Sequence, residues 1–322
     1  MPLRALTWHV HGNYMYYLAQ VPVEFYLPVK DGRPEGYGGR AAGLAWPDNV
    51  REVDADAVRD LELDVVLFQS RRNWETDQHE ILSDAQRRLP RVYLEHDPPR
   101  EHPTDTRHAV DDREVLLVHV THFNELMWDS GRTPTTVIEH GVAVPEDVRY
   151  TGDFDRGVAV VNGMDWRGRR VGTDVFDTAR QSVPLELVGI GSEKVGGLGE
   201  VPHELLPALE SQYRFFFNPV RYTSLALSLC EAMMIGMPPV VVGTCEYATV
   251  VRDGVNGYAD TDLARLVDRM RFLIDDRAEA VRLGRAARDT ALERFRIDRF
   301  VHDWEAVLTG VAGRTGRVVV PA

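Results

Sequence analysis

The run Thr223-Ser-Leu-Ala-Leu-Ser-Leu-Cys-Glu231-Ala-Met-Met-Ile-Gly-Met-Pro238-Pro-Val-Val-Val242 decides the fold assignment. It predicts a helix over 224–235, which ends at the Gly-Met-Pro turn, and then a buried parallel strand over 239–242. A loop at a helix amino end offers N–H groups and the positive end of the helix dipole, which suit a diphosphate. About two turns further along the helix, the carboxylate of Glu231 can accept hydrogen bonds from hydroxyl groups. The run therefore predicts an anion site beside a hydroxyl-binding carboxylate.

Short apolar runs alternate with amphipathic stretches on both sides of this run. In the first half they predict strands at 4–8, 65–69, 91–95, 115–120 and 136–139, and a helix at 75–89. In the second half they predict strands at 157–161, 185–188, 215–217 and 239–242, and helices at 224–235, 263–273, 277–293 and 298–308. We expect a loop at 28–46 and a loosely structured tail after Gly310. The pattern is typical of two doubly wound α/β halves.

A domain boundary is predicted between Val144 and Phe154, where Pro145, Gly152 and acidic residues interrupt the periodicity. We therefore predict an N-terminal Rossmann-like domain over 1–147 and a C-terminal one over 148–295. Residues 296–322 form a helix and tail, for which packing against the N-terminal domain is one arrangement. Ligands of open α/β sheets bind outside the carboxyl ends of the strands, and domain interfaces are favoured ligand positions. A ligand cleft between the two halves follows.

Composition restricts the class of protein. The chain has 322 residues, 44% of them hydrophobic and 27% charged, as in ordinary globular proteins. Its net charge of -13 argues against a general nucleic-acid or membrane-surface binder. Cys230 and Cys245 are the only cysteines, so no disulfide framework is expected. We expect a cytoplasmic protein without a signal peptide or a membrane span, because the sequence lacks the apolar segments that these require.

The run 223–242 resembles the signature of family 4 retaining glycosyltransferases, roughly E-G-F-G-L-x-L-x-E-A-M-A-x-G-x-P-V-V. Residues 246–258 (EYATVVRDGVNGY) resemble the G-x-x-E-x-x-x-D-G-x-x-G segment of that family. Weaker similarities occur at 137–142, where His140 replaces an Asn, and at 185–191, 201–206 and 283–295. The resemblance covers residues 137–308. In the residues before 137, only the pattern of predicted strands is similar to the family. The resemblance implies an α/β GT-B fold, with two Rossmann-like doubly wound domains facing across a cleft.

The resemblance also implies a function and a donor site. The protein is expected to transfer a sugar from a UDP or GDP sugar to a sugar, lipid or small-molecule acceptor, with retention and without a metal ion or other cofactor. Glu231 would hold the ribose of the donor. Cations after the first strand of the second half would neutralise the diphosphate, and further contacts would come from loop residues. The donor-binding candidates besides Glu231 are Gly12, Arg167, Arg169, Arg170, Gly191, Lys194, Val201, Ser224, Leu225 and Ala226.

The chain departs from the family at two positions. Thr223 replaces the first Glu of the E-x7-E pair, which normally touches the transferred sugar, and Gln69 lies where the family often has a His. Titratable residues follow the strands of the first half, above all in the stretch 95–102. His, Asp and Glu there could position an acceptor hydroxyl. The catalytic candidates are His96, His11, Thr223 and Glu231, followed at lower rank by His119 and His122.

Two other functions stay open at this point. A sugar-nucleotide epimerase shares the fold and needs acid and base groups, which the stretch 95–102 does not exclude. A non-catalytic nucleotide-sugar-binding protein would explain the missing first Glu and the presence of Gln69. The spacing of Glu95, His96, Asp97 and His102 does not fit a zinc signature. No G-x-S-x-G elbow or P-loop is present, which disfavours hydrolases and kinases.

Overall fold

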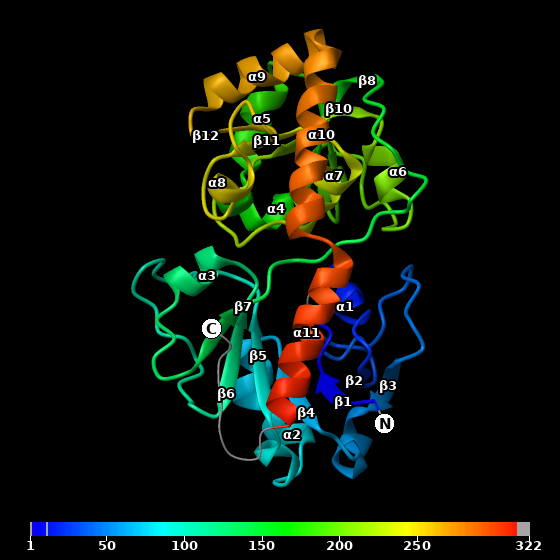
Figure 1. Ribbon diagram of the computed structural model, residues 1–322, viewed down its shortest axis with the longest axis vertical. Helices are drawn as coiled ribbons and strands as arrows, with labels where there is room; N and C mark the ends of the chain where they lie inside the picture. The colour runs from blue at the N-terminus through cyan, green and yellow to red at the C-terminus, as the bar shows by residue number, and fades with distance from the viewer. Residues whose placement is uncertain (1, 11, 314–322) are drawn as a thin grey trace. The chain divides into compact units, whose positions relative to one another are not determined.

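The computed structural model describes residues 2–10 and 12–313. The chain divides into two compact units, which we call unit 1 (Met1–Gly141 with Ile297–Ala322) and unit 2 (Val142–Arg296). Each unit is built on a parallel sheet of its own. In Figure 1, unit 1 carries the blue, cyan and red parts of the chain, and unit 2 the green to orange parts.

Unit 1 contains a seven-stranded sheet within its described residues, in the order β3-β2-β1-β4-β5-β6-β7. Its neighbouring strands all pair in parallel. The strands are β1 (Arg4–Thr7), β2 (Glu24–Val29), β3 (Val50–Asp54), β4 (Val65–Phe68), β5 (Arg91–Glu95), β6 (Val115–His119) and β7 (Thr135–Val137). The strand order changes direction between β1 and β4, so this point is the topological switch of the sheet.

The helices of unit 1 lie on both faces of this sheet. They are α1 (Gly12–Leu18), α2 (Gln78–Ile81), α3 (His122–Met127) and α11 (Ile297–Ala312). Right-handed crossovers place α1 on one face and α2 and α3 on the other, because the chain runs in opposite directions from the switch. The C-terminal α11 packs against α1, β4 and β5 (Figure 1). Its Trp304 is fully buried, and the indole Nε1 donates to the Tyr14 hydroxyl at 3.1 Å.

Unit 2 contains a five-stranded parallel sheet in its described part, in the order β12-β11-β10-β8-β9. The strands are β8 (Phe154–Val160), β9 (Leu185–Val188), β10 (Tyr213–Asn218), β11 (Pro239–Val242) and β12 (Tyr258–Asp260). The strand order changes direction between β8 and β10. Three consecutive phenylalanines of β10, Phe215–Phe217, are fully buried at the centre of this sheet.

The helices of unit 2 also divide between two faces. They are α4 (Met164–Arg167), α5 (Thr173–Arg180), α6 (Leu206–Glu210), α7 (Leu227–Ile235), α8 (Tyr247–Val250), α9 (Leu263–Asp275) and α10 (Arg277–Arg294). Right-handed crossovers place α5 on one face and α6 and α7 on the other. The contacts agree, since α9 packs on α5 while α10 packs on α7.

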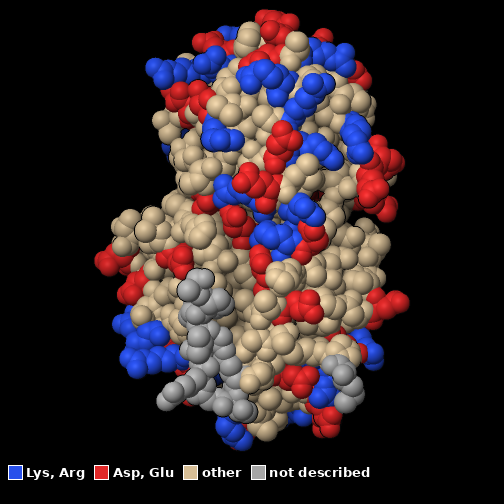
Figure 2. Space-filling view, in the orientation of Figure 1, with Lys and Arg blue, Asp and Glu red and all other residues tan. Residues whose placement is uncertain are grey.

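The outer faces of α9 and α10 are solvated, as expected from their alternating charges. Figure 2 shows Lys and Arg intermixed with Asp and Glu over this face of unit 2. Short-range ion pairs such as Arg271–Asp268 and Arg282–Glu279 occur there. Such exposed pairs contribute little to stability. Within the described residues, no helix is long and apolar enough to span a membrane.

The α/β class and the two parallel sheets confirm the predicted fold class, but β12 of unit 2 and two strands of unit 1 were not predicted. β2 contains Pro28, which lacks the N–H that a strand donates. β3 has the polar sequence Val-Arg-Glu-Val-Asp and lies at the edge of the sheet, where only its first residue is buried. The predicted loop at 28–46 therefore begins two residues too early, because β2 includes Pro28 and Val29.

The single helix predicted at 75–89 is wrong. The segment forms a π-helical turn at Asn73–Asp77, then α2, and later a 3-10 turn at Gln86–Arg88. Leu82 is extended, and the side chains of Ser83 and Gln86 each accept a hydrogen bond from the other's backbone N–H, at 3.2 and 3.0 Å. This reciprocal Ser-x-x-Gln pair is a capping box, which starts a new turn and so interrupts the helix.

The close approach of α10 to the end of α7 generates a stability prediction. A Cβ on Gly284 would lie 2.0 Å from the Gly236 carbonyl oxygen. Gly284→Ala should therefore force α10 outward and lower the free energy of unfolding by roughly 1–3 kcal/mol, which denaturant titration would measure. Gly310→Ala on α11 is the matched control, because a Cβ there meets no atom within 4 Å. Equal stability of the two variants would contradict the assigned contact.

Candidate functional site

The topological switch of each sheet locates the candidate site. Ligands of open α/β sheets bind at this point, outside the carboxyl ends of the strands. In unit 2 it is flanked by the loops at 161–163, after β8, and 219–226, after β10. In unit 1 it is flanked by Trp8 after β1 and Gln69 after β4. Among the polar side chains predicted from the sequence, those of the segment 167–170 and Thr223 follow β8 and β10, whereas His96 follows β5 and Lys194 follows β9.

In unit 2 the arginine-rich segment 167–170 lies directly beside the loop 219–226. The carbonyl of Arg170 accepts the N–H groups of Arg221 and Tyr222, at 3.0 and 3.3 Å. A Cβ on Gly172 would lie 1.9 Å from the Pro219 carbonyl oxygen, so the two segments meet backbone to backbone. The structure thus brings the predicted cations next to the start of the predicted anion loop.

Helix α7 begins without a capping side chain and carries a buried carboxylate. Its N-cap residue is Ala226, which offers no side-chain acceptor to the first amides, so the positive end of the helix is available to an anion. Ser224 and Leu225 precede it and are buried. Glu231 is only 4% exposed, and its Oε1 lies 3.1 Å from His203 Nε2. His203 comes from the segment before α6 and fixes the orientation of this carboxylate.

A second acid, Glu210 of α6, is buried close to Glu231. It is fully buried, and neither of its carboxyl oxygens has a hydrogen-bond partner among the described residues. Burial raises the pKa of Glu210 well above its usual value, and the charge of Glu231 raises it further. Both causes favour the neutral form of Glu210 over a second negative charge in this buried place.

The predicted cations of the site differ in their partners. Arg169 pairs with Asp174, which also accepts from Arg221 Nη2 at 2.8 Å. The hydrogen bond from Arg221 lowers the pKa of Asp174. Lys194 pairs with Asp165 at 3.0 Å. The side chains of Arg169 and Lys194 are 77% and 61% exposed, so either ion pair costs little to exchange for another anion.

The chain around Thr223 is fixed by the carbonyl of Arg221. This oxygen accepts the Thr244 hydroxyl at 2.8 Å and the Cys245 thiol at 3.5 Å, which ties the loop after β10 to the loop after β11. Cys245 has a left-handed backbone, with φ of 52°, and burial raises the pKa of its thiol. Thr223 is half-buried, and Thr244 and Cys245 add further uncharged groups close to it.

In unit 1, Gln69 and His96 form a buried pair at the switch. Gln69 Nε2 donates to the Trp8 carbonyl and to Thr7 Oγ1, both at 2.8 Å. Because a carbonyl only accepts, these bonds fix the orientation of the amide, and Gln69 Oε1 must be the atom that accepts from His96 Nε2 at 3.0 Å. Neutral His96 therefore carries its proton on Nε2 and its lone pair on Nδ1.

The ring of His96 is also held from the side. The Tyr14 ring meets it edge to face, with the centroids 4.7 Å apart. Tyr14 in turn contacts His140 and Phe300 and accepts from Trp304 Nε1. Burial raises the pKa of Tyr14, so the hydroxyl stays neutral. His96 is 8% exposed and has a defined orientation.

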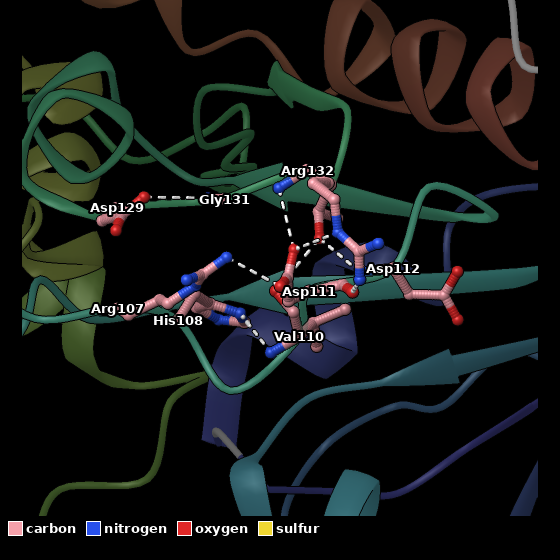
Figure 3. Close-up of polar contacts among 9 residues, drawn as sticks. Arg107, His108, Val110, Asp111, Asp112, Asp129, Gly131 and Arg132 are labelled. Carbon is pink, nitrogen blue, oxygen red and sulfur yellow. Dashed lines mark hydrogen bonds and ion pairs between the residues drawn. The ribbon is translucent and has the colours of Figure 1, made fainter.

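The acidic stretch after β5 has structural roles that the sequence did not predict. His108 Nδ1 accepts the Val110 N–H at 3.0 Å, so Nε2 carries the proton and donates to Glu95 Oε2 at 3.0 Å. Figure 3 shows how Asp111 gathers the loop further along, accepting from Arg107 at 2.7 Å and from the Arg132 N–H at 2.9 Å. These bonds stiffen residues 96–114, which connect β5 to β6 without a helix in the described chain.

The remaining histidines and Gly12 differ in their surroundings. His11 lies outside the described residues, and Gly12 is exposed at the start of α1. His119 is fully buried, and burial lowers its pKa to about 3, so its ring is neutral at neutral pH. The side chain of His122 is 70% exposed. In residues 2–10 and 12–313, no group of three or more His, Cys, Asp or Glu is arranged to hold a metal ion.

Several residues near these positions were not predicted from the sequence. His203 lies two residues after the candidate Val201, which is half-buried, and it contacts Glu231. Glu210 is fully buried on α6, a helix that the sequence did not predict. Arg221 precedes Thr223 by two residues and binds Asp174. Gly191, a predicted site residue, has a left-handed backbone and borders Asp165 and Trp166.

The sequence comparison matches one part of the chain. Residues 190–290 match the family model described as glycosyl transferases group 1. The matched segment runs from the loop after β9 into α10 and includes Glu231. No curated protein matches the sequence.

The structure is similar to solved glycosyltransferase structures over nearly its whole length. Sucrose-phosphate synthase from Thermosynechococcus elongatus is 14% identical with a TM-score of 0.69, over 95% of this chain and 98% of that one. HepE from Anabaena in complex with UDP is 15% identical with a TM-score of 0.67, over 96% and 100%. AviGT4, a glycosyltransferase of Avilamycin A biosynthesis, is 13% identical with a TM-score of 0.60, over 97% and 98%. The fold is GT-B, and the family match and these structures together support the GT-B glycosyltransferase superfamily.

Proposed function

We propose that the protein is a glycosyltransferase that binds a nucleotide-diphosphate sugar through unit 2 and transfers the sugar, with retention, to an acceptor held by unit 1. The observation that carries the proposal is the position of Glu231. It is a buried, oriented carboxylate on α7, behind an amino end that has no capping side chain, at the switch between β8 and β10. A ribose diphosphate needs this pair of features, namely an acceptor for hydroxyls and donors for phosphate oxygens.

The donor we propose is a UDP or GDP sugar. UDP is the first nucleotide to test, because HepE and TarM, two structural neighbours, are solved in complex with it. The proposed acceptor is a sugar, a lipid or another small molecule with a hydroxyl group.

Transfer breaks the bond between the anomeric carbon and the diphosphate oxygen and forms a bond to the acceptor oxygen. Negative charge grows on the leaving diphosphate, so cations and N–H groups close to it stabilise the transition state. We assign this role to the α7 amino end and to Arg167, Arg169 and Arg170, whose segment is attached to the loop 219–226. In this proposal arginine side chains, rather than a metal ion, neutralise the diphosphate.

On the acceptor side, we propose that His96 positions the attacking hydroxyl group. Its Nε2–H is committed to Gln69, so the basic nitrogen of the neutral ring is Nδ1. A hydroxyl that donates to an imidazole lone pair becomes more nucleophilic and can lose its proton as the new bond forms.

An assay with a panel of nucleotide sugars tests the proposal against its two alternatives. Release of the nucleoside diphosphate that requires both an acceptor and Glu231 supports transfer. An altered sugar without release of diphosphate would indicate an epimerase. Tight donor binding without turnover on any acceptor would indicate a binding protein.

Glu231→Gln should weaken the binding of the donor nucleotide by about tenfold to a hundredfold, because hydrogen bonds from hydroxyls to a charged carboxylate are replaced by weaker ones. Calorimetry with UDP and GDP would measure this. Glu293→Gln, at an exposed position of α10, is the control and should bind like the wild type. Unchanged affinity in Glu231→Gln would remove Glu231 from the site.

Glu210 predicts a specific pH dependence of stability. Its pKa is raised in the folded protein, so above the unfolded value of about 4.3 the folded state binds more protons than the unfolded state. The free energy of unfolding should therefore fall as pH rises through this window. Glu210→Gln removes this contribution, so its stability relative to the wild type should increase from pH 5 to pH 8. Denaturant titrations across that range would show it, and a pH-independent difference would mean that Glu210 is ionised.

Gln69→Leu should lower kcat for transfer by about tenfold or more, because it removes the acceptor that holds His96 in one tautomer, while the KM for the donor stays within about twofold. His96→Ala should have a similar effect. Since Gln69 acts through His96, the double variant should be little worse than either single variant. Additive losses in steady-state kinetics would contradict this coupling.

A further inference from the structure

Trp166 is an exposed aromatic side chain at the candidate site that none of the roles above uses. It lies in α4, directly after the loop that follows β8. It is 60% exposed, although Trp is usually among the more buried residue types. Ile190, in the loop after the neighbouring β9, is also 45% exposed. An exposed aromatic side chain at the edge where ligands of such sheets bind is a candidate for ligand contact.

The backbone under the Trp166 ring is shaped to support it. A Cβ on Gly163 or on Gly191 would lie 2.6 Å from atoms of the ring. Both glycines have left-handed φ values, 72° and 77°. The Gly163 N–H donates to the Ile190 carbonyl at 2.9 Å, which fixes the two loops relative to each other. The indole therefore packs against the backbone of two loops and remains exposed, so that a planar ligand can stack on it.

Two cations lie close to the ring in the chain or in space, and one of them is paired with an acid. Arg167 is the next residue, and Lys194 Nζ lies 5.7 Å from the ring centroid and 3.0 Å from Asp165 Oδ2. The ammonium group shows that a face of the ring is accessible to a group attracted by π electrons. The exposed Lys194 side chain can leave that face when a flat ligand arrives. An aromatic surface next to two cations is complementary to a nucleotide, in which a planar base adjoins phosphates.

We propose that Trp166 stacks on the base of the nucleotide donor and so forms the base subsite of unit 2. The inference rests on the proposed function, because it assumes a nucleotide ligand. Stacking on an aromatic side chain tolerates any base, so Trp166 would increase the affinity for nucleotides without discriminating among their bases. Specificity for one base would come from groups that contact the edge of the base.

The test measures the binding of UDP, GDP and inorganic pyrophosphate to the full chain and its variants. Trp166→Ala should weaken binding of the preferred nucleoside diphosphate by about tenfold or more, and Trp166→Phe by less. Pyrophosphate has no base. Its Kd, obtained by competition with a nucleotide and corrected for the nucleotide's own Kd, should be the same in wild type and Trp166→Phe. Nucleotide should also quench tryptophan fluorescence in the wild type and much less in Trp166→Phe. Phe272→Ala, at a 42% exposed aromatic on α9, is the control and should bind like the wild type.

The possible outcomes separate this inference from the function it rests on. If the wild type binds a nucleoside diphosphate and Trp166→Ala binds it equally, the base subsite is wrong and the proposed function stands. An unchanged nucleotide Kd with a raised acceptor KM would assign Trp166 to the acceptor and likewise overturn the inference. Equal loss of nucleotide and pyrophosphate binding in both variants would make Trp166 a structural support of the loops. A wild type that binds no nucleoside diphosphate would overturn both proposals.

Discussion

The contact between Gly236 and Gly284 is the constraint on which the proposed donor site depends. Helix α7 has buried residues on every side, from Leu229 to Ile235, which is typical of a helix enclosed by other elements. Its carboxyl end meets α10 so closely that only glycine fits at position 284. The helix cannot rotate or slide without losing this packing, so its amino end and the carboxylate of Glu231 are held at one place in unit 2.

Burial of α7 places the carboxylate of Glu231 away from water, and neighbouring residues compensate for the cost of burying it. A carboxylate that is 4% exposed requires a compensating partner. His203 shares a hydrogen bond with Glu231, and burial raises the pKa of Glu210, which favours its neutral form. A similar arrangement orients His96 in unit 1, where Gln69 accepts the Nε2 proton. In both units a polar side chain near the switch is oriented by a hydrogen bond from or to a neighbouring side chain.

The sequence predicted some elements that have strong local signals, missed others such as α5, and missed features that depend on distant contacts. The helix and strand at 224–242 were predicted well, because the Gly-Met-Pro turn separates two strongly apolar segments. β3 was missed because its polar sequence forms a strand only through its pairing with β2. The orientation of Gln69 depends on the Trp8 carbonyl, 61 residues away. The exposure of Trp166 depends on Gly191 in another loop, so the sequence alone could not distinguish it from a core residue.

Thr223 determines how far donor binding and transfer can be separated in this protein. The resemblance places a carboxylate there, against the transferred sugar, whereas the chain has hydroxyl and thiol groups at Thr223, Thr244 and Cys245. Neutral groups can hold sugar hydroxyls but add less stabilisation to an oxocarbenium-like transition state than a carboxylate does. The proposed diphosphate contacts, at the amino end of α7 and the arginine segment, do not include the side chain of Thr223. In the proposed mechanism, stabilisation of the leaving group therefore contributes a larger share of catalysis than contact with the sugar.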